Sequence, residues 1–584
     1  MIYLLDYGAG NVRSLANSIQ SLGFEYKWVT SPDDITKATK LIFPGVGAFG
    51  PAMKALRAKG FAEPLKQYIA SGKPYMGICI GMQALCLSSA ENPDVPGLGV
   101  IPANVSMFSS ATKAVPHIGW NSAISISPQS NHSHQSTTLD SAVYFVHSYR
   151  VSYTTELDAW ANTLTRYGDE VFVSSFRRGN IFATQFHPEK SGAVGLEILR
   201  QWLSEPSTPQ VLEVGLESRT TIDPEALTAQ TGLMKRIIAC LDVRANDDGD
   251  LVVTKGDQYD VRESTTNPTS NGITTNSKGE VRNLGKPVEL ARRYYVEGAD
   301  EITFLNITSF RACPLHDQPM LSVLQKAAET VFVPFCVGGG IRDTFDPDGT
   351  KRTALEVATE YFRAGADKVS IGGDAVLAVE KLLAGESIGE TSIEAISKVY
   401  GSQAVVVSID PKRIYVSRPE EVPIEHQSSV VDLTAPLSPT DSTNGDCIEV
   451  PTGLGPNGEK FCWYQCTVKG GRELRPVDVV QLATGVMALG AGEILLNSID
   501  QDGCKAGFDL RLIRLVKQHV SIPVIASSGA GRVEHFQQVF NVTGAEAGLA
   551  AGIFHRNEVS LSSVKEHLSK SNTLVRSTSL IIPS

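Results

Sequence analysis

Tyr75-Met-Gly-Ile-Cys-Ile-Gly-Met-Gln83 decides the fold of the first part of this chain. Apolar, strand-forming residues lead into Gly77-x-Cys79-x-Gly81, and a helix-like run follows to Leu87. This order predicts a strand that turns sharply into a helix with Cys79 at the turn, as in a nucleophile elbow. A helix N-terminus there would favour the thiolate form of Cys79. The alternative is a buried thiol that only packs.

A second segment supplies the partners that a thiolate nucleophile needs. Phe186-His-Pro-Glu-Lys-Ser191 places His187 and Glu189 two residues apart. We expect an extended backbone there, which would point both side chains to the same side. Glu189 would then orient the imidazole, and His187 would shuttle protons for Cys79. Taken together, the two segments predict nucleophilic catalysis by a cysteine triad.

These residues resemble the class I, or triad, glutamine amidotransferases. Pro44-Gly-Val-Gly47 matches that family's oxyanion-hole loop, with Gly45 and Gly47 at its two glycine positions, although an ordinary strand-to-helix turn would also fit. Gln83 matches the position beside the substrate glutamine. The resemblance implies a flavodoxin-like α/β glutaminase domain over residues 1–204 that binds L-glutamine.

Bulk properties narrow the remaining possibilities. A chain of 584 residues is too long for one core, so two or more domains are expected. The net charge of −11 argues against a nucleic-acid-binding protein, because such proteins need positive charge to bind phosphates. Nine scattered cysteines and a nucleophilic thiol favour a reducing compartment, and no signal peptide or membrane span is visible, so we expect a cytoplasmic protein. No cysteine or histidine set has zinc spacing, and we expect neither a metal nor a cofactor.

The second half of the chain repeats one design. The pattern breaks over residues 205–232, where we expect a linker. Beyond it, four Gly-Ala turns each enter a short apolar strand, and four more apolar strands alternate with helical patterns. About eight such units predict a (β/α)8 TIM barrel over residues 233–570, followed by a tail of 571–584. The four turns begin at Gly298, Gly365, Gly490 and Gly544.

The sequences of the two halves of the barrel also resemble each other. The third and seventh strands end in Gly338-Gly-Gly-Ile341 and Ser527-Ser-Gly-Ala-Gly531. Such turns bind phosphate through backbone N–H groups, so a pair of them suggests a substrate with a phosphate at each end. The first and fifth strands end in Asp242 and Asp410, which would face the middle of that substrate as general acid and base. The alternative is that each aspartate merely caps the following loop.

This half resembles the cyclase of the imidazole glycerol phosphate synthase family over nearly all of residues 233–568. Matching segments include Lys235-Arg-Ile-Ile-Ala-Cys-Leu-Asp242 and Ser408-Ile-Asp-Pro-Lys-Arg413. A glutaminase placed ahead of it resembles the fungal and plant bifunctional form, which implies that no separate subunit is needed. The implied reaction joins glutamine-derived ammonia to a phosphoribulosyl formimino aminoimidazole carboxamide ribonucleotide (PRFAR). The implied products are imidazole glycerol phosphate, for histidine, and an aminoimidazole carboxamide ribonucleotide (AICAR), for purines.

The resemblance also implies a set of substrate-binding positions in the barrel. Asn306 stands where an aspartate is common in separate cyclases, and Gly372 and Asn497 occupy positions that are often Asn and Thr. Two other functions stay open: a glutaminase feeding a different phosphorylated acceptor, and an inactive scaffold that only binds a bisphosphate. The implied positions are Lys255, Asn306, Gly338, Gly339, Gly372, Gly373, Asn497, Asp502, Gly503, Ser527, Ser528, Gly529, Ala551 and Gly552.

Four charged residues fall near strand starts, on the face opposite the chemistry. Two cations and two anions there would form a salt-bridged ring that closes the bottom of the barrel, and the positions match the family's proposed ammonia gate. The alternative is a stabilising ion cluster with no role in transport. Lys190, beside the triad, is expected to pair across the domain interface with Asp367. The ring positions are Arg236, Glu301, Lys368 and Glu493.

Three segments are rich in Ser, Thr, Asn, Gly and Pro: residues 128–140, 263–281 and 419–460. We expect surface loops without a packed core at these insertions, and the sequence indicates no function for them.

Overall fold

The computed structural model describes residues 1–8, 10–126, 142–210, 227, 232–245, 251–254, 262–268, 274–281, 283–307, 314–386, 389–437 and 453–578. Of the expected linker 205–232, only 205–210, 227 and 232 are among them. Insertion 128–140 and Lys255 lie outside the described residues.

The first part is an α/β unit around an eight-stranded sheet of order β2-β1-β3-β4-β13-β12-β11-β8. Its strands β1 to β4 and β13 run parallel, and every residue of β1, β3, β4 and β13 is buried. Near-continuous apolar runs such as these are typical of strands covered on both faces. The strands are β1 (Ile2–Leu5), β2 (Tyr26–Val29), β3 (Lys40–Phe43), β4 (Tyr75–Ile78), β8 (Ile124–Ser125), β11 (Ala161–Tyr167), β12 (Glu170–Arg178) and β13 (Ile181–Thr184). The helices are α1 (Arg13–Ser21), α2 (Pro32–Lys37), α3 (Phe49–Ala58), α4 (Ala62–Ala70), α5 (Ile80–Gln83) and α7 (Gly192–Ser204).

Smaller strands flank this sheet. β7 and β9 form an antiparallel pair at the boundary with the second part, and β5, β6 and β10 form a three-stranded sheet. Their bounds are β5 (Ser88–Ser89), β6 (Asn104–Met107), β7 (His117–Ser122), β9 (Ala142–His147) and β10 (Tyr149–Arg150).

The second part is a closed barrel of eight parallel strands, as the repeat predicts. The circle closes because β30 pairs with β14. The strands are β14 (Arg236–Ala245), β18 (Glu301–Asn306), β19 (Phe335–Gly338), β22 (Lys368–Ile371), β23 (Val405–Ile409), β28 (Glu493–Asn497), β29 (Val524–Ser527) and β30 (Ala547–Ala550). Around them lie α8 (Pro287–Val296), α9 (Pro319–Ala327), α10 (Ala354–Ala364), α11 (Gly373–Leu383), α12 (Ser392–Tyr400), α13 (Val479–Ala488), α14 (Leu510–His519), α15 (Val533–Thr543), α16 (Gly552–His555) and α17 (Leu561–Lys570).

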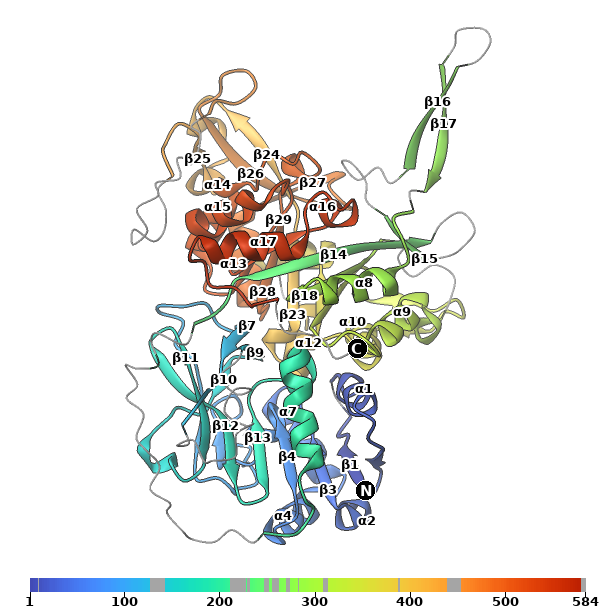
Figure 1. Ribbon diagram of the computed structural model, residues 1–584. Coiled ribbons are helices and arrows are strands. Elements are labelled where there is room, and N and C mark those ends of the chain that lie inside the picture. The colour runs from blue at the N-terminus through green and yellow to red at the C-terminus, as the bar shows by residue number, and fades with distance from the viewer. Residues whose placement is uncertain are drawn as a thin grey trace.

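The first part docks on the end of the barrel where the strands begin (Figure 1). The amide of Gly192 donates to Phe332 O at 2.9 Å, and that of Val115 donates to Ser521 O at 2.8 Å. Phe332 and Ser521 both lie a few residues ahead of a barrel strand. The opposite end, where TIM-barrel chemistry takes place, is therefore left open for a substrate.

The insertions are more ordered than the sequence predicts. Residues 262–268 and 274–281 form an antiparallel hairpin, β16 (Arg262–Pro268) and β17 (Thr274–Val281), which extends away from the barrel in Figure 1. Part of 419–460 packs into a four-stranded sheet above β23, where buried His426 stacks on Trp463. The expectation of loops is wrong at these places because strand pairing satisfies the backbone. The added strands are β15 (Leu251–Thr254), β24 (Pro411–Val416), β25 (Val431–Asp432), β26 (Phe461–Val468) and β27 (Glu473–Asp478).

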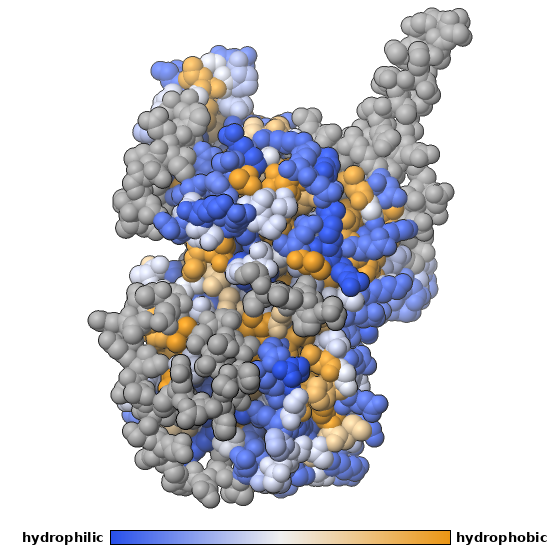
Figure 2. Space-filling view, in the orientation of Figure 1, coloured by the Kyte–Doolittle hydropathy of each residue, from blue (hydrophilic) through white to orange (hydrophobic). Residues whose placement is uncertain are grey.

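The surface over the barrel helices is mainly hydrophilic in the view of Figure 2, with small, separate hydrophobic areas. Within the described ranges, no helix is both long and apolar enough to cross a membrane. The same residues contain no cluster of His, Cys, Asp and Glu side chains suited to a metal ion.

Candidate active sites at the two ends of the barrel

Cys79 lies at the sharp turn that the sequence predicts. β4 ends at Ile78, α5 begins at Ile80, and Cys79 between them has φ +50° and ψ −100°. A non-glycine residue at positive φ stores backbone strain, of order 1–3 kcal/mol, and such residues cluster at active sites. The turn also needs Gly81, because a Cβ there would lie 2.0 Å from Phe43 O. The helix is a single turn, shorter than the run to Leu87 suggested.

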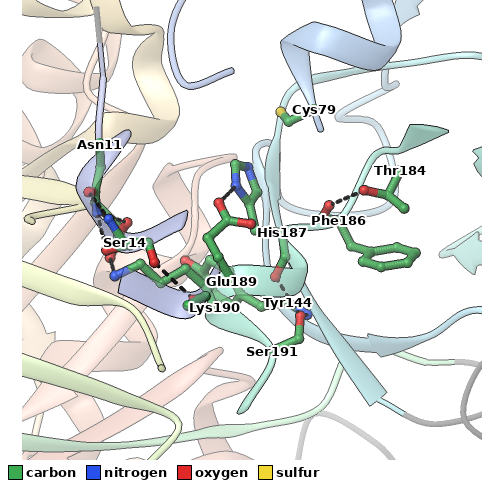
Figure 3. A network of polar contacts seen from close by, with 12 residues as sticks. Asn11, Ser14, Cys79, Tyr144, Thr184, Phe186, His187, Glu189, Lys190 and Ser191 are labelled. Carbon is green, nitrogen blue, oxygen red and sulfur yellow. Dashed lines mark hydrogen bonds and ion pairs between the residues drawn. The ribbon is translucent and has the colours of Figure 1, made fainter. Parts of the chain in front are cut away.

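His187 lies between Cys79 and Glu189 (Figure 3). The His187 Nδ1 and Glu189 Oε1 atoms are 2.8 Å apart, and both side chains are buried. The predicted contact is therefore present, but the predicted extended backbone is wrong: Pro188–Lys190 forms a 3-10 turn. Pro188 opens that turn because its fixed φ suits a first helical position.

The electrostatics of this group make His187 a stronger base. Burial alone would lower the pKa of His187, but the Glu189 carboxylate and Cys79 outweigh it and hold that pKa well above its ordinary value. A basic imidazole beside a cysteine is what nucleophilic catalysis by a thiol requires. Glu189 fixes the imidazole with its other nitrogen directed at the sulfur.

The loop after β3 packs directly on the elbow. A Cβ at Gly45 would lie 2.4 Å from Ile80 Cβ, so only glycine allows this approach. Gly47 has φ +140°. The Tyr7 hydroxyl donates to Val46 O at 2.7 Å and fixes the middle of the loop. The loop is thereby held against the elbow that carries Cys79, where an oxyanion hole would have to lie.

One glutamine contacts the thiol and a second one contacts the first, and the sequence analysis missed the first. Gln185 Nε2 lies 3.4 Å from Cys79 Sγ. Its Oε1 accepts a hydrogen bond of 3.0 Å from Gln83 Nε2, and Gln83 is itself buried. Gln185 precedes the His187 segment by two residues, but no local pattern marks a lone glutamine, so only the fold reveals it.

The residue after Glu189 points the other way, toward the barrel (Figure 3). Lys190 Nζ lies 2.7 Å from Asp367 Oδ2, which is the pair expected across the interface. Asn11 Nδ2 adds a hydrogen bond of 2.9 Å to Asp367 Oδ1. Asp367 directly precedes β22, so the triad segment is tied to the start of a barrel strand.

The four predicted ring residues meet at the bottom of the barrel. Each is the first residue of its strand, and each side chain is fully buried. Arg236 contacts both Glu301, at 2.7 Å, and Glu493. Lys368 Nζ lies 2.7 Å from Glu301 and 2.5 Å from Glu493. Burial opposes the charge on Lys368, but the two carboxylates outweigh it and raise its pKa.

Tyr144 connects this ring to the triad, and the sequence analysis did not identify it. Its carbonyl accepts a hydrogen bond of 2.9 Å from the amide of His187. Its ring is fully buried, and burial together with the charge of Glu301 raises the pKa of its hydroxyl well above the ordinary value. A side chain of the first part of the chain therefore lies close to the charged ring.

The interior of the barrel above the ring contains an apolar cluster. Arg236 and Asp242 lie six residues apart on β14, so about 20 Å separate the ring from the mouth. The side chains between them form a small cluster of their own. Its members include Ile238, Cys240, Cys336, Val406, Leu495 and Ile525.

A cavity of about 450 Å³ opens at the other end of the barrel. Asp242 and Asp410 both line it, as predicted. Burial raises the pKa of Asp410, and nearby Asp502 adds to this, although a hydrogen bond of 2.7 Å from Asn497 opposes the shift. Cys240 Sγ lies 3.6 Å from Asp242 Oδ1. The cavity thus holds two carboxylates in different surroundings, which suits one acid and one base.

The implied substrate-binding positions divide between the two halves of the barrel. Asn497, Asp502, Gly503, Ser527, Ser528, Gly529, Ala551 and Gly552 line the cavity. Asn306, Gly338, Gly339, Gly372 and Gly373 end or follow their strands at the same rim but do not line this cavity. Four lining cations were not expected from the sequence: Arg244, Arg472, Lys505 and Arg556.

Comparisons with known proteins agree with this two-part architecture. Residues 3–205 match the family "Glutamine amidotransferase class-I", and residues 236–435 and 445–560 match "Histidine biosynthesis protein". "Imidazole glycerol phosphate synthase hisHF" of Emericella nidulans is 52% identical over 98% of this chain and 98% of its own. The Arabidopsis thaliana protein of that name, termed chloroplastic, is 52% identical over 99% of this chain and 89% of its own. "Imidazole glycerol phosphate synthase subunit HisF" of Methanobrevibacter smithii is 40% identical over 51% of this chain and 89% of its own.

Proposed function

The chain belongs to the imidazole glycerol phosphate synthase family in its fused form, and from that premise we propose what each of its two sites does. One site hydrolyses L-glutamine to glutamate and ammonia. The ammonia passes through the barrel to the other site, which converts PRFAR to imidazole glycerol phosphate and AICAR. The observation that carries this proposal is the alignment, in one chain, of a triad, a charged ring and a two-carboxylate cavity along one barrel.

At the triad, Cys79 attacks the glutamine carboxamide. His187 takes the thiol proton and delivers it to the departing ammonia, while Glu189 keeps the imidazole oriented. The backbone of Gly45–Gly47 stabilises the oxyanion of the tetrahedral intermediate. Water then hydrolyses the thioester with His187 as base, and glutamate leaves. Gln83 and Gln185 position the substrate beside the sulfur.

The ring and the apolar interior keep ammonia from the solvent. Ammonia released into water at neutral pH becomes ammonium, which is not a nucleophile. Moving a charged ammonium through an apolar interior is costly, whereas neutral ammonia passes more easily. The ring of Arg236, Glu301, Lys368 and Glu493 acts as the gate, and the Lys190–Asp367 pair reports the state of the barrel to the triad.

At the mouth, Asp242 acts as the principal general base and Asp410 as its acid partner. The raised pKa of Asp410 keeps a proton available for donation at higher pH than an ordinary aspartate allows. The glycine-rich turns hold the two phosphates at opposite sides of the rim. This places the middle of the substrate, where ammonia is added and the bond to AICAR breaks, between the carboxylates.

The organisation of the chain follows from the same proposal. We assign residues 1–204 to the glutaminase, 205–232 to a linker, 233–570 to the cyclase and 571–584 to a tail. Because both activities reside in one chain, no separate subunit is needed. We propose a cytoplasmic location, and L-glutamine and PRFAR as the only small-molecule substrates.

A stimulated glutaminase assay tests the proposal. Glutamate release is measured with and without PRFAR, and the products are identified by mass spectrometry. We expect release to rise strongly with PRFAR and to accompany imidazole glycerol phosphate and AICAR in equal amounts. Glutamate release that ignores PRFAR, or an amidated product of another kind, would assign the chain a different ammonia acceptor.

A further inference from the structure

A cation on the β26–β27 hairpin faces the catalytic cavity without any role so far. We propose that Arg472, at the tip of this hairpin, binds one of the two substrate phosphates from above the barrel mouth. The inference rests on the proposed function, since it assumes a substrate with two phosphates. Arg472 and Gly470 both line the cavity, although they lie in the turn between β26 and β27 and not on a barrel strand.

The hairpin is fastened to helix α11, which begins at Gly373, one of the implied substrate-binding positions. Arg475 forms two hydrogen bonds to Glu380 on α11, of 2.7 and 2.5 Å. Val468, at the end of β26, lies 3.7 Å from the position of a Cβ on Gly373. The hairpin therefore runs along α11 toward its N-terminus.

The contacts of Arg475 with Glu380 and of Val468 with Gly373 determine how far along α11 Arg472 lies. Glu380 and Gly373 lie two turns apart on α11, which is about 10 Å. Arg472 lies three residues ahead of Arg475, in the turn that joins β26 to β27, so at most about 10 Å separate the two residues. The tip of the hairpin consequently reaches the level of the Gly372–Gly373 turn, beside the rim of the barrel.

Arg472 is the cation of this hairpin that is left free. Lys469 Nζ lies 2.7 Å from Glu473, and Arg475 is held by Glu473 and Glu380. Within the described ranges, no carboxylate or carbonyl binds the guanidinium of Arg472. A guanidinium that is free and faces a cavity is suited to bidentate binding of phosphate.

Gly372 leaves room for this interaction. No atom lies within 4 Å of the position that a Cβ would take on Gly372. The family often has Asn at this position, and its amide is absent here. In this inference, the guanidinium of Arg472 provides the donors that the amide would supply.

The hairpin also contacts the acid of the cyclase site. Thr467 donates from its amide, at 3.2 Å, and from its hydroxyl, at 2.7 Å, to Asp410 O. Binding of a phosphate by Arg472 would fix β26 against the barrel mouth. Because Thr467 of β26 is bonded to Asp410, this would also fix the position of Asp410. Arg472 is thus a binding residue that also helps to position the acid.

A second cation lines the cavity beside α16. The guanidinium of Arg556 lies over Gly552, with a nitrogen 2.7 Å from the position of a Cβ there. Its Nε donates to Glu558 at 2.8 Å, so the terminal nitrogens face the cavity. Arg472 and Arg556 come from different elements, one beside α11 and one beside α16, and we assign each of them a different phosphate.

Each product carries only one of the two substrate phosphates, so inhibition by each product reports on one phosphate site. Imidazole glycerol phosphate and AICAR each carry one phosphate of the substrate. Arg472→Met, Arg556→Met and the control Lys469→Met are compared in ammonia-dependent synthesis, with inhibition by each product measured separately. Lys469 lies in the same turn and carries the same charge but is already paired, so its replacement controls for loss of surface charge.

For Arg472→Met we expect the KM for PRFAR to rise about ten- to hundredfold. Inhibition by one product should weaken by a similar factor while inhibition by the other stays unchanged. Arg556→Met should show the reverse preference, and Lys469→Met should match the parent. Glutamine hydrolysis without nucleotide should be equal in all four proteins.

An unchanged KM in Arg472→Met, or equal weakening of inhibition by both products, would overturn the inference and leave the proposed function standing. Failure of the parent protein to convert PRFAR would instead overturn the proposed function itself.

Discussion

Replacing Lys368 by Met should uncouple the two reactions and weaken the barrel at once. Lys368 Nζ contacts Glu301 and Glu493, and all three side chains have zero exposure. In the variant, the two carboxylates share Arg236 alone, and the buried ring changes from neutral to one net negative charge. Removing one partner of a buried ion pair costs about 3–5 kcal/mol, because a buried charge is left uncompensated. We expect a loss of unfolding free energy in that range.

The uncoupling follows from the same geometry. A methionine fills most of the space of the lysine stem but binds neither carboxylate, so water can enter to solvate them. Water at the ring protonates ammonia and lets it escape as ammonium. Glutamine should then be consumed in several-fold excess over imidazole glycerol phosphate, while synthesis from ammonium salts persists.

Glutamate and imidazole glycerol phosphate are quantified in one reaction, and stability is measured by denaturant unfolding. The matched control is Lys368→Met combined with Glu493→Gln, which restores neutrality with one cation and one anion. This control should recover part of the stability and remain uncoupled. A ratio near one glutamate per product in both variants would refute the gate and leave the ring as a stabilising cluster.

Three further substitutions test other parts of the chain. Asp242→Asn should abolish synthesis from glutamine and from ammonium salts alike, while PRFAR still stimulates glutamate release; near-normal turnover would exclude Asp242 as the base. Because Glu189 raises the pKa of His187, Glu189→Gln should lower glutaminase kcat about 10²–10⁴-fold and shift its pH profile to lower pH; an unshifted profile would show that Glu189 does not set that pKa. Burial and neighbouring Arg576 lower the pKa of Lys565 to about 7, so the unfolded chain binds more protons between pH 7 and the ordinary lysine pKa. Across that window the unfolding free energy should rise with pH more steeply in the parent than in Lys565→Met, and equal slopes in calorimetric scans would contradict the shift.

Short sequence motifs predicted those site residues whose positions depend on their neighbours in the chain. Gly77-x-Cys79-x-Gly81 predicts the elbow because only glycines allow its close approaches, such as that of Gly81 to Phe43 O. The barrel repeat predicts where strands begin, and this located the ring residues. The His187–Glu189 contact is predicted correctly but for the wrong backbone, since Pro188 starts a 3-10 turn.

Contacts between distant segments could not be predicted in this way. Gln185 meets Cys79, and Tyr144 meets the ring, only because β13 and β9 fold against other elements. Arg472 reaches the cavity from the turn between β26 and β27, which follows the insertion 419–460, and the pairing of β26 with β24 became visible only in the fold. Residues of this kind carry no signal in the spacing of neighbouring side chains.

The central claim is that nitrogen from the glutamine amide reaches the cyclase site without entering the solvent. It is tested by supplying glutamine labelled with ¹⁵N in its amide together with PRFAR and unlabelled ammonium. The ammonium concentration is kept too low to support synthesis alone but well above the ammonia that glutamine releases. Mass spectrometry of imidazole glycerol phosphate should find nearly complete labelling of one ring nitrogen. Labelling diluted to the isotopic composition of the solution would contradict passage through the barrel.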